Sequence, residues 1–187
     1  AGSVNSYRRL LEQIARVSGA RVISVDYRQL PQVHLADTVS DAMDAYVALL
    51  ETVDSPHRIV VAGDSAGGYL TFKVAELARR RGLQAPAALI GFSPLLSLDP
   101  DNQRKAVEHA VEINDAYLPA KRVDEMLRPE TEAFAMRLAA KDVPVELHIW
   151  REQVHAFPLL VNFIPEARQA VTDAVAFVER HVPNRSV

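Results

Sequence analysis

Short β-rich segments alternate along this chain with longer segments whose apolar residues recur at helical spacing. Strands are predicted over residues 21–27, 58–64, 87–93 and 145–150. Helices are predicted over residues 4–17, 36–52, 66–81, 101–138 and 166–181, the fourth interrupted by Pro119 and Pro129. This alternation predicts an α/β fold, with a mostly parallel sheet and helices on both of its faces. In such sheets ligands bind beside the carboxyl ends of the strands.

The composition is that of one ordinary globular domain, so residues 1–187 are predicted to form a single domain. The chain is 49% apolar and 24% charged with a net charge of −3, which gives no indication of nucleic-acid binding. The basic run at 79–81 ends a helical pattern and is predicted to be a solvated helix end. No apolar run approaches the roughly 20 residues that span a bilayer. The start of the sequence lacks the order of a secretion signal, which favours the cytoplasm.

The absence of cysteine narrows the chemistry that is open to the chain. It excludes disulfides, a cysteine nucleophile and metal sites built from thiolates. No two histidines share the spacing of metal ligands, so neither a metal nor another cofactor is predicted.

A run of small residues follows the predicted strand 58–64. It contains a G-x-S-x-G motif centred on Ser65, and the small residues of the run are Gly63, Asp64, Ala66, Gly67 and Gly68. Between a strand and a helix, this motif lets the chain turn sharply and exposes the serine Oγ above the sheet. The N–H of Ala66 would then point to where an oxyanion forms. The alternative is a tight turn with a serine that caps the helix.

A serine hydroxyl becomes a good nucleophile only when a base takes its proton. Among the six histidines, His155 follows the carboxyl end of a predicted strand in the irregular stretch REQVHAF. The alternative is an ordinary loop histidine. The other five lie within or before predicted strands, on predicted helices or in an early loop: His34, His57, His109, His148 and His181.

A third group must orient the imidazole and stabilise it once it is charged. In this class of serine hydrolase the acid lies between the serine and the histidine in the sequence. Spacing alone does not choose among the carboxylates there, which are Glu76, Asp99, Asp101, Glu108, Glu112, Asp115, Asp124, Glu125, Glu130, Glu132, Asp142, Glu146 and Glu152.

Four stretches, in order along the chain, resemble the hormone-sensitive-lipase-like carboxylesterases, a branch of the α/β-hydrolases with bacterial members. They are SVDYR followed by Leu30-Pro31, GDSAGG, FSPLLSLD, and the helix–strand–loop unit 124–157. The resemblance implies Ser65 as nucleophile, His155 as general base and Asp124 as orienting acid, with Gly67 and Gly68 leaving room beside the acyl group. It also implies esters of short to medium acyl chains as substrates. A homodimer through 145–150 and 166–181 is expected as well.

The sequence departs from the family pattern in two places. The HGGG segment, which supplies further oxyanion donors in the family, is absent, and one lost donor costs about 3–4 kcal/mol of transition-state stabilisation. The apolar strand that leads to the acid is also absent, because the chain reads AYLPAKRVDEML before and after Asp124. A sheet without an interior strand leaves backbone groups unpaired. We therefore expect the sequence to join parts of a longer chain, with 101–122 as a cap-like or linking segment.

Three functions are consistent with these residues. The first is hydrolysis of carboxylic esters through an acyl-enzyme. The second is binding of a small molecule, without catalysis, on the same fold. The third is an amidase or peptidase with the same triad, which differs from an esterase only in the leaving group.

Overall fold

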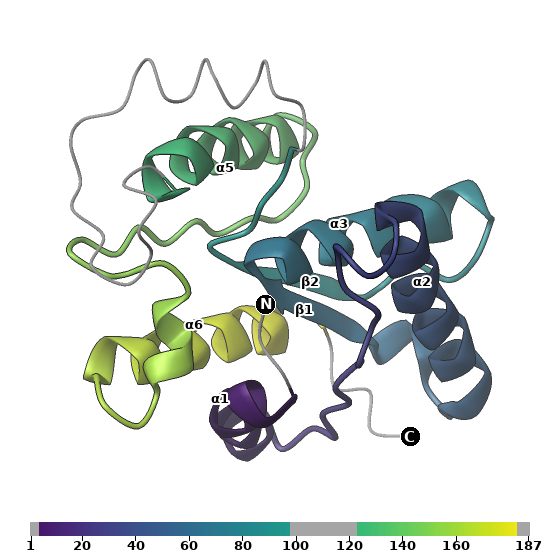
Figure 1. Ribbon diagram of the computed structural model, residues 1–187, viewed down its shortest axis with the longest axis horizontal. Helices are drawn as coiled ribbons and strands as arrows, with labels where there is room; N and C mark the ends of the chain where they lie inside the picture. Colours follow the sequence, from purple (N-terminus) through teal and green to yellow (C-terminus); the bar gives the residue numbers. More distant parts are fainter. Residues whose placement is uncertain (1–3, 98–122, 183–187) are drawn as a thin grey trace. The chain divides into compact units, whose positions relative to one another are not determined.

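The computed structural model describes residues 4–97 and 123–182 (Figure 1). The first part contains α1 (Val4–Ser18), α2 (Leu35–Thr52), the 3₁₀ turn η1 (Pro56–Arg58), β1 (Val60–Asp64), α3 (Ser65–Arg80) and β2 (Ala88–Phe92). The second contains α5 (Val123–Ala139), the 3₁₀ turn η2 (Phe157–Leu160) and α6 (Pro165–His181). None of the helices in the described residues is long and apolar enough to cross a membrane.

The predicted helices are confirmed wherever the structure describes them. Two of them end where the sequence predicts, because Gly19 and Gly82 adopt φ values of +64° and +67°, which a helix cannot continue through. The sequence predicts that the helix is interrupted at Pro129. This prediction is wrong, because α5 continues through that residue. The cap-like segment 101–122 lies outside the described residues.

The sheet of the described residues is smaller than the sequence predicts. β1 and β2 pair in parallel, which confirms the strands expected at 58–64 and 87–93. The strands expected at 21–27 and 145–150 are wrong, because neither segment has strand structure. A strand exists only where a neighbour completes its hydrogen-bond ladder, whereas the β-rich composition of a segment depends on that segment alone.

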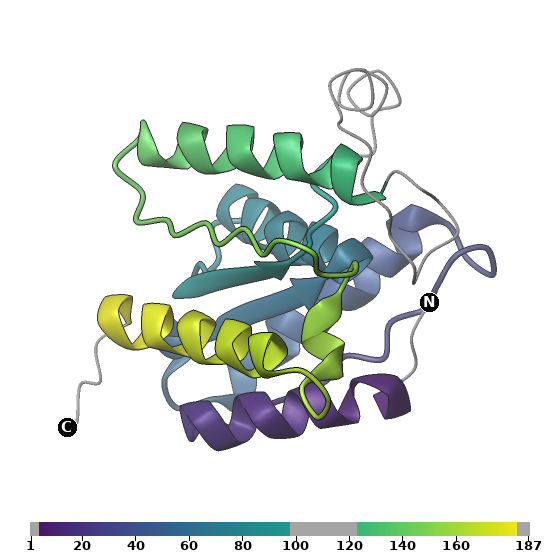
Figure 2. The same ribbon diagram turned by 90° about the vertical axis from the view of Figure 1, so that its left-hand side faces the viewer.

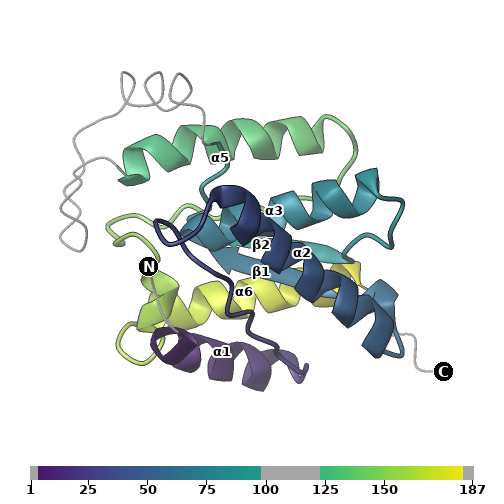
Figure 3. The ribbon, with the colours of Figure 1, turned by 45° about the vertical axis from the view of Figure 1, so that its right-hand side comes forward.

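Helices cover both faces of the β1–β2 pair, as expected for an α/β layer arrangement. Figure 1 and Figure 3 show α2 and α3 on one face and α1 and α6 on the other. α1 packs directly on α6, and Leu10 and Val171 are among the buried residues of these two helices. The first and last helices of the described chain therefore form one layer.

One buried cluster of the described residues joins α2, the residue before β1, and α3. Its buried members are Met43, Tyr46, Ile59, Val74 and Ala78. The hydroxyl of Tyr46 donates a hydrogen bond to the carbonyl of Gln84 at 2.7 Å, and burial raises the pKa of this phenol. The one polar atom of this largely buried side chain thus has a hydrogen-bond partner.

The residues fall into two compact units. The first comprises Ala1–Ala62, Leu70–Ile90 and Pro158–Val187, and it contains the buried cluster and the α1–α6 pair. The second comprises Gly63–Tyr69 and Gly91–Phe157. This second unit includes every residue that the sequence singles out for catalysis.

Candidate active site

Ser65 stands at the point where β1 ends and α3 begins. β1 ends at Asp64 and α3 begins at the serine itself, so no loop separates strand from helix. Ser65 has a φ of +47°, in the left-handed region that residues other than glycine rarely adopt. A non-glycine residue held in that region is under strain that the surrounding structure must compensate, and such residues cluster at functional sites. The chain thus makes the sharp turn that the small residues predict.

The segment after β2 holds this turn in place. A Cβ built on Gly68 would lie 2.5 Å from the Cβ and 2.7 Å from the Cα of Pro94, so the glycine permits a close approach of two backbones. The N–H of Leu95 donates a hydrogen bond of 3.0 Å to the carbonyl of Ser65. Ser93, beside this contact, also has a positive φ, of +44°. The first turn of α3 therefore rests on residues 93–95, which fill the space beside Gly68.

The start of α3 offers donors to a developing negative charge. The first N–H groups of any helix have no acceptor within the helix, and the helix dipole places positive charge there. Ala66 is the second residue of α3 and is exposed. Its N–H is the donor that the motif predicts for an oxyanion formed beside Ser65.

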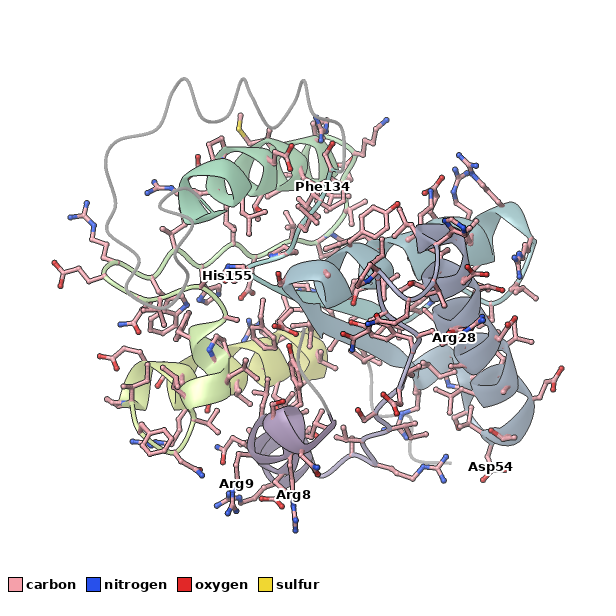
Figure 4. All side chains as sticks on the ribbon, in the orientation of Figure 1. Arg8, Arg9, Arg28, Asp54, Phe134 and His155 are labelled. Carbon is pink, nitrogen blue, oxygen red and sulfur yellow. The ribbon has the colours of Figure 1, made fainter. Side chains whose placement is uncertain are left out.

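His155 lies in the loop between residue 150 and η2, where Figure 4 labels it. Its side chain is buried, with 5% exposed. The rings of Trp150 and Phe157 meet at a centroid distance of 5.7 Å across the loop, and the N–H of Phe157 donates to the carbonyl of Val154 at 3.1 Å. Ala156 has a φ of +56°, so the backbone turns sharply beside the histidine. The loop around His155 is thus fixed by rings and backbone together.

Asp124 is the second residue of α5, and its side chain lies outside the described residues. The compact unit that contains the Ser65 turn also contains α5 and the His155 loop. The three residues of the expected triad therefore belong to one unit although they are far apart in the sequence. A hydrogen-bonded Ser65–His155–Asp124 triad stays a prediction.

Two of the competing carboxylates, Glu76 and Glu132, form ion pairs with neighbouring basic side chains. Glu76 pairs with Lys73 at 2.8 Å and with Arg80 at 2.6 Å, and the hydrogen bond from Lys73 lowers its pKa. Glu132 pairs with Arg128 at 2.8 Å on α5. The sequence predicts solvated charges on these helices, including the basic end of α3, and the ion pairs agree with that prediction. The two carboxylates therefore have a structural role.

Sequence reasoning missed the residues that support the site. Pro94 against Gly68, and the Trp150–Phe157 ring pair, join segments whose contact no local pattern indicates. The signal available was the stretch FSPLLSLD, in which a serine and a proline follow the strand directly. Within residues 4–97 and 123–182 the structure has no group of three or more histidine or carboxylate side chains that could hold a metal.

Comparison with known proteins finds a matching family model and several similar hydrolases. Residues 1–128 match a family model described as the alpha/beta hydrolase fold. The chain is 30% identical over 206 aligned residues to esterase LipU of Mycobacterium tuberculosis, an alignment that covers 87% of this chain and 68% of LipU. It is 28% identical over 211 residues to an acetyl-hydrolase of Streptomyces hygroscopicus, covering 95% of this chain and 71% of that protein.

Among solved structures, an esterase of Pyrobaculum calidifontis superposes with a TM-score of 0.83. The two sequences are 25% identical, and the match covers 96% of this chain and 72% of the other. The helices and strands of this chain therefore correspond to most of the fold of this longer esterase.

Proposed function

Because the chain belongs to the α/β-hydrolase family, among whose members are esterases, we propose that it hydrolyses carboxylic esters through Ser65, His155 and Asp124. Residues 1–187 form one catalytic domain in this proposal. The observation that carries it is the positive φ of Ser65 at the junction of β1 and α3. A capping serine in an ordinary tight turn needs no such backbone conformation, whereas an exposed nucleophile does.

The reaction proceeds in two steps that share one base. The Oγ of Ser65 attacks the acyl carbon of the ester while His155 takes the hydroxyl proton, and the N–H of Ala66 donates to the oxyanion. The C–O bond to the alcohol breaks, and the protonated His155 returns the proton to the leaving oxygen. Water, which gives its proton to His155, then attacks the acyl-enzyme and releases the acid. The carboxylate of Asp124 orients the imidazole and stabilises its charged form.

The proposed substrates are small esters with short to medium acyl chains. A relative whose name is acetyl-hydrolase supports the short end of that range. Self-association through residues 145–150 and α6 is also part of the proposal, and sedimentation velocity over a range of concentrations tests it. Neither a metal nor an organic cofactor enters the proposed reaction.

Labelling with a fluorophosphonate probe, followed by peptide mapping, tests the proposed nucleophile and base. We expect stoichiometric modification of Ser65 in the parent chain and loss of labelling in His155→Gln, because the hydroxyl then has no base. His57→Ala changes an exposed histidine on η1 and serves as the matched control, with labelling unchanged. A folded parent chain that is not labelled contradicts the proposal and favours a binding function. Comparing ester with amide substrates then separates an esterase from an amidase.

A pair of neighbouring carboxylates tests the proposed acid. Asp124→Asn is expected to lower the labelling rate by about 10⁴-fold, since the amide stabilises the wrong imidazole tautomer. Glu125→Gln, one residue further along α5, is the matched control and is expected to leave the rate within about twofold, because the proposal gives Glu125 no role in the reaction. Equal rates in both variants would show that another carboxylate orients His155.

A further inference from the structure

The chain makes two successive turns just before η2, and His155 lies in the second of them. Figure 1 and Figure 2 show the segment after α5 running back along this helix before it reaches the turns. Residues 151–152 and 155–156 form the two turns. The N–H of Phe157 donates to the carbonyl of Val154 at 3.1 Å and closes the second turn around the histidine. The position of the imidazole therefore depends on this turn.

Each turn contains a residue in a backbone conformation that favours glycine. Glu152 has a φ of +59° and Ala156 a φ of +56°, and each is the second residue of its turn. Glycine or asparagine normally occupies such a position, because a residue with a bulkier side chain is strained there. Strain of this kind persists only where surrounding contacts compensate for it. The loop 150–157 therefore needs contacts that hold it closed.

An aromatic pair joins the two ends of this loop. Trp150 precedes the first turn and Phe157 follows the second, and their ring centroids are 5.7 Å apart with an angle of 54° between the rings. Aromatic rings attract one another at such a separation when they are tilted or offset. Phe157 is buried and Trp150 is half-buried, so the contact is largely shielded from water. The ring pair thus holds the ends of the loop together across two strained turns.

We propose that Trp150 is a positioning residue for His155. This inference rests on the proposed function, in which the imidazole takes the hydroxyl proton of Ser65. Trp150 acts through Phe157: the ring contact keeps the second turn closed in spite of the strain at Ala156, and so it keeps the imidazole in one place. A general base must lie within hydrogen-bond reach of the proton that it takes, so a small displacement of the turn slows the reaction.

The rate of fluorophosphonate labelling tests the positioning role. Trp150→Leu keeps an apolar side chain but removes the ring. We expect the maximal rate to fall about 100-fold, because a displacement of about 1 Å costs that much, with the probe concentration at half-maximal rate unchanged. Trp150→Phe keeps a ring and is expected to stay within about threefold of the parent rate. A merely structural role would lower the free energy of unfolding and leave the maximal rate of the folded chain unchanged.

A second substitution relieves the strain that the ring pair is proposed to hold. Adding Ala156→Gly to Trp150→Leu is expected to recover about tenfold in rate, because glycine adopts a positive φ without strain and the turn stays closed. Asp142→Gly is the matched control. Asp142 has the same φ of +56° in the turn after α5, so the change relieves equal strain away from the histidine and should recover nothing.

Hydrogen exchange at the amide of Phe157, followed by NMR, reports on the second turn without any reaction. We expect slow exchange in the parent and in Trp150→Phe, and exchange at least about tenfold faster in Trp150→Leu, because the turn opens. Protected amides of β1 show that each chain is folded. If Trp150→Leu lacks them, Trp150→Met takes its place, since the flexible methionine side chain fills irregular gaps.

The outcomes separate this inference from the proposed function. A Trp150→Leu chain that is labelled at the parent rate overturns the positioning role and leaves the proposed function standing. Equal exchange of the Phe157 amide in both chains also overturns the role, as does a loss of rate that neither Trp150→Phe nor Ala156→Gly avoids. A folded parent that is not labelled overturns the proposed function, and the positioning role with it.

Discussion

Ser65 and His155 could be singled out from the sequence because each lies in a short stretch with a chemical meaning of its own. The small residues around Ser65 predict a sharp turn, and its φ of +47° confirms that turn. Pro94 could not be found in this way, because its contact with Gly68 depends on how the ends of β1 and β2 meet. The acid of the proposed triad could not be chosen from spacing, because several carboxylates lie between Ser65 and His155 in the sequence.

Replacing Gly68 tests whether the close approach to Pro94 matters. A glycine-to-alanine change inside a helix normally stabilises it by roughly 0.5–1 kcal/mol. Here the added methyl would overlap Pro94, and such overpacking costs about 1–3 kcal/mol. Gly68→Ala is therefore expected to lower the free energy of unfolding in urea and to slow labelling of Ser65. Arg79→Ala, at an exposed position of the same helix, is the control, and equal stability of the two variants would contradict this account.

At the scale of elements, the start of α2 is joined to the loop before it by one arginine. The guanidinium of Arg28 donates to both carboxylate oxygens of Asp41, at 2.9 and 2.7 Å, and the N–H of Arg28 donates to the same carboxylate at 2.9 Å. The hydroxyl of Thr38 donates to the carbonyl of Arg28 at 2.8 Å. Figure 4 labels Arg28 beside α2. Side chains from α2 thus fix the end of the segment 21–27, although no strand does.

The hydrogen bond from Arg28 lowers the pKa of Asp41 to about 2, from an ordinary value of 3.8. A lowered folded-state pKa stabilises the fold above the unfolded value, and the contribution is lost as pH falls through the folded value. Asp41→Asn should therefore destabilise the chain at pH 6, and the difference from the parent should shrink between pH 4 and 2. Urea unfolding across this range measures it. A difference for Asp41→Asn that stays constant from pH 6 to pH 2 would contradict the assignment.

The strands show where prediction from the sequence stops. Segments 21–27 and 145–150 have β-rich composition, yet only 58–64 and 87–93 gave strands. The backbone hydrogen bonds of a helix lie within one segment, so a helix can be predicted from the residues of that segment alone. A strand needs a partner that its own residues do not specify.

At the scale of the whole molecule, the sequence predicts the fold class correctly, but two of the four strands that it predicts for the sheet are not formed. The alternation of segments gives helices on both faces of a parallel pair, as the structure shows (Figure 3). One compact unit contains a buried cluster whose members include the fully buried Met43. The second unit carries the residues of the proposed chemistry.

Two methionines test where the stability of the molecule lies. Met43→Ala removes a fully buried side chain and should lower the free energy of unfolding by about 2–5 kcal/mol. Met136→Ala, on α5, removes a side chain that is 73% exposed and should change it by less than about 0.5 kcal/mol. Urea denaturation followed by circular dichroism compares the two. Similar losses in both variants would mean that the cluster does not dominate the stability.

The backbone conformation of Ser65 has a practical consequence for anyone who wishes to capture a substrate. Glycine adopts a positive φ without the cost that serine bears, so Ser65→Gly relieves strain at the same time as it removes the hydroxyl. Serine is thus the more strained residue of the two at this position, and the proposed mechanism explains its presence by the oxygen atom that acts as nucleophile. Under the proposed mechanism, a Ser65→Gly chain would bind an ester without hydrolysing it, so the bound ester could be identified.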